Sequence, residues 1–175
     1  MQVFRLARYN RRHDLSGYGA YLYGGRWNLP GQAMLYTAEL RALALVELLV
    51  HLPVEDLPPD MYLLTLEVPD DASREELPLS ALPDNWRGIT QPQPTAQLGH
   101  EWLQAGRTLA LRVPSVIVPQ EHNLLLNPAH PEFFRVRLAQ EPEPFTFDER
   151  LRKPGLSFGQ AGGSSQFVTK AGLTR

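Results

Sequence analysis

The chain has 175 residues, 43% of them hydrophobic, which suits one soluble domain large enough to bury a core. Its 17 basic and 19 acidic residues give a formal net charge of −2, so the composition offers no electrostatic reason to bind nucleic acid. Cysteine is absent, which excludes disulfides and thiolate chemistry.

The N-terminal residues predict the start of a domain rather than a targeting segment. Arginines interrupt the apolar residues of MQVFRLARYNRRHD throughout. The longest apolar run, residues 42–50, contains Glu47 and is too short to cross a bilayer. We therefore expect a cytoplasmic protein without a membrane partner.

The first part of the chain predicts strands around one strong helix. The strands are predicted at residues 2–9, 33–38 and 61–68. Residues 39–51 have the composition of a helix, and Thr37 stands where a residue can cap it.

The second part predicts more strand than helix. Prolines make residues 69–94 loop-rich, and a short helical turn is predicted at residues 101–104. Further strands are predicted at residues 108–113, 116–118, 133–138 and 145–147.

The order of these elements predicts the fold class. Strands outnumber helices and do not alternate with them regularly, so we expect a mixed α+β domain and not a doubly wound parallel sheet. We place this domain at residues 1–151. Residues 152–175 are rich in Gly, Ser and Thr, and we expect a flexible tail there.

Glu47 is the most informative single residue. On a helical projection it lies in the middle of an apolar face, among Leu40, Leu43, Ala44 and Val50. A carboxylate without a partner is costly to bury there. It either forms a buried ion pair with an arginine or is held in a dry cleft to stabilise developing positive charge, and periodicity does not decide between the two.

Residues 24–28, GGRWN, are the second candidate. Paired glycines let the backbone approach a ligand closely, and Arg26 suits a phosphate or a carboxylate. The alternative is a tight loop in which Arg26 stacks on Trp27 or pairs with Glu47. The preceding GYG lacks a third glycine and a strand–helix context, so it does not indicate a dinucleotide-binding fingerprint.

Arginine is concentrated in the first 26 residues, against the single acid Asp14. Such a segment suits an anionic ligand such as a pyrophosphate, although a solvated face explains Arg11 and Arg12 equally well. Arg5 stands between Phe4 and Leu6 in a predicted strand, and its side chain is a candidate to point into a cleft.

Three other polar residues are candidates. Tyr36, just before the helix that carries Glu47, is placed to stack on a flat ring, with a core tyrosine as the alternative. Ser115 and Asn123 offer a hydroxyl and an amide to a sugar or an amide, but no G-x-S-x-G elbow marks Ser115 as a nucleophile. The five histidines lack metal-binding spacing, so we expect no metal.

Taken together, these features resemble the RES-domain family of toxins, named for an arginine, a glutamate and a serine. The resemblance runs from Phe4 to Leu151. The stretches that carry it are FR, SGYGAYLYGGRWNLPG, LYTAELRALALVELLVHL, LPDNWR, LRVPSVIVPQEHNLLLNPAHPEF and FTFDERL. Their order and spacing are highly specific.

The resemblance implies an ADP-ribosyltransferase fold, with two facing β-sheets around an NAD⁺ cleft and flanking helices. It implies an enzyme that takes NAD⁺ as substrate, with no cofactor, and breaks the nicotinamide–ribose bond by hydrolysis or phosphorolysis. It also implies the toxin of a bacterial type II toxin–antitoxin system. An Xre-like antitoxin would cover the active site and bind the DNA, so we expect no direct DNA binding by this chain. The oligomeric state stays open, a homodimer included.

By the same resemblance, the catalytic residues are Glu47, Arg26 and Tyr36, and the substrate-binding residues are Arg5, Ser115 and Asn123. Glu47 would stabilise the cationic ribose, and the arginines would hold the pyrophosphate or ribose end. Two alternatives remain. One is transfer of ADP-ribose to a specific protein. The other is a non-enzymatic module whose basic N-terminal segment binds an acidic protein or nucleic acid.

Overall fold

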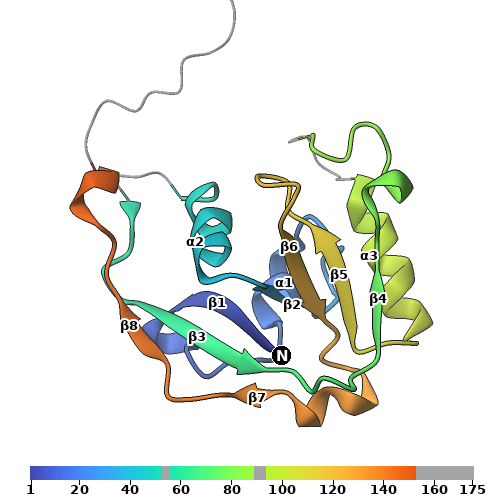
Figure 1. Ribbon diagram of the computed structural model, residues 1–175, viewed down its shortest axis with the longest axis horizontal. Helices are drawn as coiled ribbons and strands as arrows, with labels where there is room; N and C mark the ends of the chain where they lie inside the picture. The colour runs from blue at the N-terminus through green and yellow to red at the C-terminus, as the bar shows by residue number, and fades with distance from the viewer. Residues whose placement is uncertain (53–55, 89–93, 153–175) are drawn as a thin grey trace, which may run out of the picture.

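Eight strands join into one mixed sheet in the order β4-β5-β6-β2-β1-β3-β7, with β8 also paired to β3 (Figure 1). The computed structural model describes residues 1–52, 56–88 and 94–152. The strands are β1 (Gln2–Arg8), β2 (Leu35–Ala38), β3 (Met61–Glu67), β4 (Arg74–Glu76), β5 (Ala110–Pro114), β6 (His122–Leu126), β7 (Arg137–Leu138) and β8 (Glu143–Phe145). The helices are α1 (Tyr18–Tyr23), α2 (Arg41–Leu49) and α3 (Pro94–Ala105), and shorter 3-10 helices lie at Tyr9–Arg11, Leu79–Ala81, Pro131–Arg135 and Glu149–Arg152.

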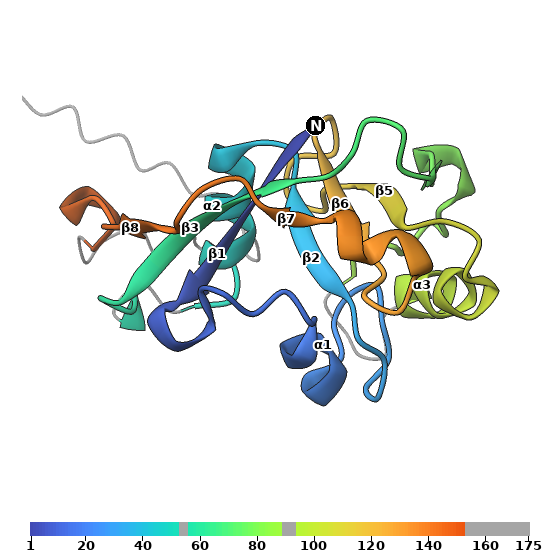
Figure 2. The same ribbon diagram turned by 90° about the horizontal axis from the view of Figure 1, so that it is seen from below.

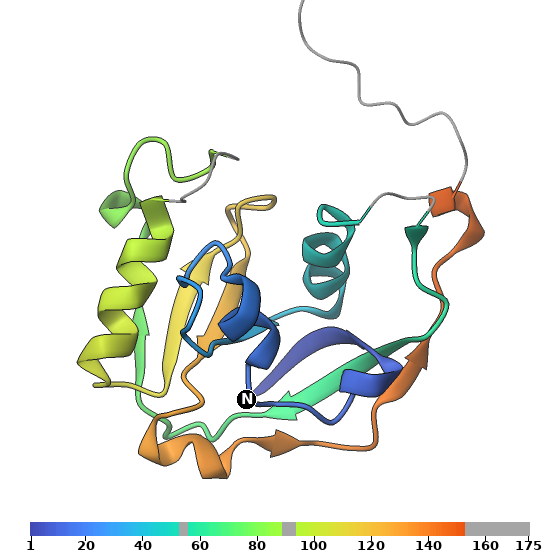
Figure 3. The same ribbon diagram turned by 180° about the vertical axis from the view of Figure 1, so that it is seen from behind.

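The sheet divides into two halves where β1 meets β2. β1 and β3 pair along their whole length, from Gln2 opposite Glu67 to Arg8 opposite Met61. β1 and β2, in contrast, share the single register pair of Phe4 with Ala38. We call β1, β3, β7 and β8 the first half, and β2, β4, β5 and β6 the second half. A one-pair junction lets the halves run in different directions, as Figure 3 shows.

One face of both halves shares a single buried core. This core takes Val3 and Leu64 from the first half, and Leu35, Leu124 and Leu126 from the second. Because residues from both halves pack together, the described residues form one mixed α+β domain, as the sequence predicted. The two facing sheets implied by the resemblance correspond to the two halves of one hydrogen-bonded sheet.

Different helices cover the other face of each half. Leu45 and Leu48 of α2 pack with Leu6 and Met61 of the first half. Trp102 of α3 belongs to a separate cluster on the second half, which also contains Trp27, Leu111 and Leu125. Figure 2 shows α2 and α3 well apart, each near its own half of the sheet. The candidate site residues lie around the junction between the two halves of the sheet.

The first part of the chain follows the sequence prediction closely, with one correction. The predicted strands and helix form as β1, β2, β3 and α2, each slightly shorter than expected. The expectation that Thr37 caps α2 is wrong. Leu40 occupies the N-cap position with no side-chain hydrogen bond. Thr37 is buried in β2, and its Oγ1 donates to Leu124 O at 2.6 Å.

The second part departs further from the prediction. Residues 116–118 form a bend rather than a strand, because Ser115 Oγ accepts hydrogen bonds from the amides of Ile117 and Val118 and closes a turn there. The antiparallel partner of β5 is β6, a strand that the sequence analysis missed. The helical turn expected at residues 101–104 is the end of the 12-residue helix α3.

The C-terminal elements are also shorter than predicted. Residues 133–135 belong to a 3-10 helix, and only Arg137 and Leu138 pair as the short strand β7. The last predicted strand shifts to β8. The loop-rich residues 69–94 contain β4, which pairs parallel with β5. The predicted tail lies outside the described residues from residue 153 onward. None of the described helices is long and apolar enough to span a membrane.

Candidate active site

The loop that carries Arg26 begins where α1 ends. Gly24 ends the helix with a positive φ of 69°, which a glycine adopts readily. Gly25 N then donates to Asn28 O at 3.0 Å, which closes a tight turn. A Cβ on Gly25 would lie 2.6 Å from Tyr36 Oη. The second glycine is therefore needed for β2 to approach the loop.

The Tyr36 hydroxyl anchors this loop. It donates to Asn28 Oδ1 at 2.7 Å and accepts from Trp27 N at 3.0 Å. Burial raises the pKa of the phenol above its ordinary value, although the Trp27 amide and the charge of Arg26 act in the opposite direction. The hydroxyl is therefore a neutral structural group. Stacking of the Tyr36 ring on nicotinamide stays a prediction.

Backbone carbonyls hold the Arg26 guanidinium. Nη1 donates to Trp86 O at 2.8 Å and to Gly88 O at 3.2 Å, and Nη2 donates to Gly88 O at 3.3 Å. Burial lowers the pKa of Arg26, while the nearby charges of Glu47 and Tyr36 raise it. Carbonyl acceptors fix the plane of the guanidinium and so set its direction in the site.

Glu47 lies on α2, half-buried, with its carboxylate fixed by an amide. Asn123 Nδ2 donates to Glu47 Oε1 at 2.6 Å. The sequence left open whether Glu47 pairs with an arginine or is held in a cleft. Among the described residues its carboxylate accepts from the neutral amide of Asn123 and is attracted electrostatically by Arg26. The apolar face predicted around Glu47 is also narrower than expected, because Leu40 and Val50 are 48% and 57% exposed.

Arg5 lies on the same face of β1 as Val3 and Ala7, which belong to the core shared by the two halves. Nη1 donates to Tyr36 O at 3.0 Å, while Nε is buried without a hydrogen-bond partner among the described residues. Burial lowers the pKa of Arg5, and the charge of Asp14 opposes that shift. Arg5 therefore occupies the junction between β1 and β2, as expected of a side chain aimed inward.

Ser115 has a different environment from the other candidates. It is fully buried at the end of β5, and its Oγ accepts from Ile117 N and Val118 N, both at 3.1 Å. Its amide donates to Glu121 O at 2.9 Å. These bonds give Ser115 a structural role in the turn between β5 and β6. A contact with ribose or amide stays a prediction.

The structure thus brings Arg26, Tyr36, Glu47 and Asn123 together, with Arg5 bonded to the backbone beneath them. β6 supplies Asn123, which lies opposite Ala38 at the end of β2. A carboxylate, a cation and an aromatic ring in one place can stabilise a developing cation and bind an anionic group. No group of three or more His, Asp or Glu side chains could hold a metal ion in the described part of the chain.

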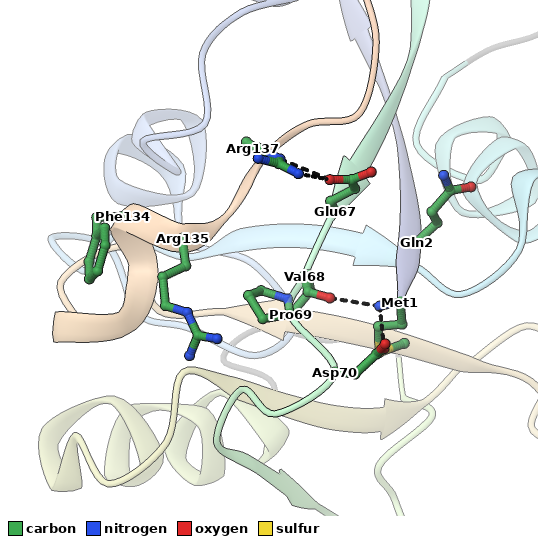
Figure 4. Close-up of a pocket in the computed structure, with 9 residues that line it drawn as sticks. All are labelled: Met1, Gln2, Glu67, Val68, Pro69, Asp70, Phe134, Arg135 and Arg137. Atoms are coloured by element: carbon green, nitrogen blue, oxygen red, sulfur yellow. Dashed lines mark hydrogen bonds and ion pairs between the residues drawn. The ribbon is translucent and has the colours of Figure 1, made fainter.

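A cavity of about 640 Å³ lies elsewhere (Figure 4). It is lined by the start of β1, by residues 67–70 at the end of β3, and by residues 134, 135 and 137 around the start of β7. Its lining shares no residue with the candidate site. Its charged groups are paired with one another or with neighbours: Arg137 with Glu67, and the Met1 amino group with Asp70. Saturated ion pairs leave little charge for a ligand, so we do not assign chemistry to it.

Sequence reasoning missed the groups that support Arg26. Trp86 belongs to the LPDNWR stretch and Gly88 follows it directly, and no side-chain pattern revealed the role of their carbonyls. Thr95 donates from Oγ1 to Arg26 O at 2.7 Å. Backbone acceptors leave no signature in a sequence. A threonine at the start of a helix is equally typical of an ordinary cap, so it gave no separate signal.

Comparison with known proteins places the chain in a family. The RES domain family matches residues 2–148. A protein of Sphingobium sp. (strain YBL2), named "Prs ADP-ribosylating toxin", is 44% identical over 147 residues, which is 83% of this chain and 91% of that protein. A "Toxin Res" of Yersinia enterocolitica is 41% identical over 155 residues, 87% of this chain and 100% of that protein.

The fold is also found in a solved structure. The crystal structure of the M. tuberculosis MbcT–MbcA toxin–antitoxin complex contains a chain that superposes with a TM-score of 0.59. The match covers 83% of this chain and 81% of that one, at 18% sequence identity. At this identity the likeness establishes a shared fold.

Proposed function

This chain belongs to the RES-domain family of toxins, and from this membership and the site we propose that it is the toxin of a toxin–antitoxin pair that breaks the nicotinamide–ribose bond of NAD⁺. One observation carries the proposal. The Glu47 carboxylate is held at 2.6 Å by Asn123 within electrostatic reach of Arg26, beside Tyr36.

The reaction suits a site with an anion and no strong acid. As the C–N bond breaks, its electron pair leaves with nicotinamide, which departs neutral, and the ribose becomes oxocarbenium-like. Water then adds at that carbon and loses a proton, giving ADP-ribose, or phosphate adds to give an ADP-ribosyl phosphate. Glu47 would stabilise the cationic ribose, and Asn123 would keep its carboxylate oriented.

The arginines would bind the anionic part of NAD⁺. Two backbone carbonyls orient the Arg26 guanidinium, and a guanidinium fork matches a phosphate. Arg5 has a buried Nε that lacks a partner among the described residues, at the junction of the two halves. Ser115 is assigned to the turn rather than to substrate in this proposal.

A second candidate function is transfer of ADP-ribose to a protein. The observation that favours it is the name of the Sphingobium relative, a Prs ADP-ribosylating toxin that is 44% identical. Both functions require the same bond cleavage and differ in the acceptor. Glu47 would stabilise the ribose cation equally well in either.

The test follows both products of NAD⁺ labelled on the adenylate phosphate. Purified protein is incubated with the labelled NAD⁺ in phosphate-free buffer, with phosphate, and with added Prs protein. We expect free nicotinamide in every case. The label identifies the acceptor, because it appears in ADP-ribose, in ADP-ribosyl phosphate or on protein. Absence of nicotinamide release from the folded protein under all three conditions would contradict the proposed function.

We also propose that an Xre-like antitoxin inhibits this chain by covering Arg26 and Glu47. A carboxylate-bearing segment would pair with the arginines and exclude substrate at once. NAD⁺ should then compete with the antitoxin for the toxin, and the toxin alone, with its net charge of −2, should not retard DNA. Simultaneous binding with unchanged turnover would rule occlusion out.

A further inference from the structure

α3 lies directly against the backbone that carries Arg26. Thr95, which is fully buried, donates from Oγ1 to Arg26 O at 2.7 Å. One turn further along the same face, a Cβ on Gly99 would lie 1.7 Å from Trp27 O. The Thr95 hydroxyl and the absence of a side chain at Gly99 therefore let α3 contact the backbone of Arg26 and Trp27.

The Arg26 guanidinium is held by residues that come shortly before α3 in the sequence. Its guanidinium donates to the carbonyls of Trp86 and Gly88, only a few residues before α3 begins. The main chain and the guanidinium of Arg26 are thus fixed independently. None of these supporting residues carries the chemistry described above.

We propose that Thr95 and Gly99 are positioning residues, through which α3 sets where Arg26 stands relative to Glu47. For its activity readout this inference rests on the proposed function. It extends the site to a helix that the sequence analysis reduced to a short turn and that supplies no group to the substrate.

The contact differs from ordinary helix packing. α2 meets the sheet through leucine side chains, which can adjust their rotamers when a neighbour changes. α3 shares an apolar cluster with the Arg26 loop through Trp102 and Trp27, but it also meets the loop through backbone at Gly99 and through one short hydrogen bond at Thr95. A methyl group added at Gly99 must therefore displace the loop. A displacement of about 1 Å in a catalytic site can cost on the order of 10²-fold in rate.

The three tryptophans of the chain report on this contact without any turnover. Trp27 is in the loop, Trp102 is in α3, and the Trp86 carbonyl binds Arg26. All three side chains are buried. Intrinsic tryptophan emission therefore follows the position of the loop directly.

The experiment compares matched pairs of variants. Thr95→Val removes the hydroxyl and Thr95→Ser keeps it, while Thr37→Val removes the same kind of buried threonine–carbonyl bond away from Arg26. Gly99→Ala adds a methyl group against Trp27, and Gly19→Ala adds one in α1, where nothing lies within 4 Å. Each variant is measured for kcat/KM with NAD⁺, melting temperature and tryptophan emission.

We expect kcat/KM to fall about tenfold in Thr95→Val and on the order of 10²-fold in Gly99→Ala, with shifted emission in both. Thr95→Ser, Thr37→Val and Gly19→Ala should keep kcat/KM per folded molecule and the wild-type emission. If Thr95→Val and Gly99→Ala lose only melting temperature, as Thr37→Val should, the proposal is overturned.

The outcome stays decisive if the proposed function fails. A wild-type protein that leaves NAD⁺ intact would contradict that function, and emission alone would then decide the role of α3. A shift in Gly99→Ala that Gly19→Ala lacks would support control of the loop by α3. Identical spectra would overturn it.

Discussion

The two halves of the sheet are built from different kinds of contact. In the first half, β1 and β3 pair along their full length, and α2 covers them through leucines. In the second half, β2 pairs with β6 from far along the chain, and α3 meets a polar loop through a hydroxyl and a glycine. The first half is a regular apolar scaffold, whereas the second half supplies Arg26, Tyr36 and Asn123. Glu47 and Arg5 link the two halves: Glu47 stands on α2 and accepts from Asn123, and Arg5 of β1 donates to Tyr36 O.

The largest effect is expected from a change at Glu47, whose hydrogen bond with Asn123 links the two halves. Glu47→Gln should lower NAD⁺ cleavage by ~10²-fold or more, because an amide cannot stabilise a ribose cation as a carboxylate does. The glutamine oxygen can still accept from Asn123, so the melting temperature should change little. Glu101→Gln, an exposed change on α3, is the matched control. Near-normal nicotinamide release by folded Glu47→Gln would remove Glu47 from the catalytic role.

Arg26→Lys tests whether the second half contributes geometry or only charge. A lysine keeps the charge but cannot donate in one plane to the carbonyls of Trp86 and Gly88 while facing a phosphate. We expect kcat/KM for NAD⁺ to fall about tenfold or more. Arg137→Lys, at the exposed ion pair with Glu67, serves as the control. A lysine variant with wild-type kinetics would mean that Arg26 acts as a point charge.

Ser115→Ala separates structure from chemistry within the second half. The change leaves two buried amides, those of Ile117 and Val118, without their acceptor, which should cost about 1–3 kcal/mol of unfolding free energy. Activity per folded molecule should stay near wild type, as it should in the exposed control Ser80→Ala. Urea unfolding and NAD⁺ kinetics measure the two effects. Lost activity at unchanged stability would return Ser115 to the substrate-binding group.

The smallest expected effect is a pH dependence at Tyr36. Burial raises the pKa of this phenol in the folded protein, so the unfolded chain ionises first, near pH 10. Stability should therefore fall as pH rises above about 10, by less than about 1 kcal/mol between pH 8 and pH 10.5. Urea unfolding of Tyr36→Phe should lack this loss, whereas the exposed Tyr23→Phe should keep it. Equal pH slopes in Tyr36→Phe and wild type would show that this hydroxyl does not titrate as described.

The same division explains what the sequence could predict. β1, β3 and α2 have continuous apolar patterns, and their positions were predicted within a few residues. β6 begins with the polar residues His122 and Asn123, and its apolar residues are leucines, whereas residues 116–118 are a β-branched run of higher strand propensity. α3 mixes proline, glycine and threonine with its apolar residues, so its length was hidden.

The candidate site shows the same limit. Arg26, Tyr36, Glu47 and Asn123 were named from residue chemistry and from the resemblance, and the structure brings them together. Their partners were beyond reach, because the Glu47–Asn123 bond and the carbonyls behind Arg26 depend on tertiary contacts. Ser115 shows a similar limit: the sequence suggested a sugar contact, which stays a prediction, and gave no sign that its hydroxyl also accepts two amides in a turn.

The position of β6 has a consequence for synthesis on the ribosome. The bond between Glu47 and Asn123 spans 76 residues, and β2 lies between β1 and β6 in the sheet. A growing chain that has emerged only as far as α3 already carries Arg26, Tyr36 and Glu47, but β2 has no neighbour on its outer side. Contacts this distant in sequence also form slowly. Most of this chain therefore emerges from the ribosome before Glu47 and Asn123 can come together. During that period the proposed site is incomplete in the nascent protein.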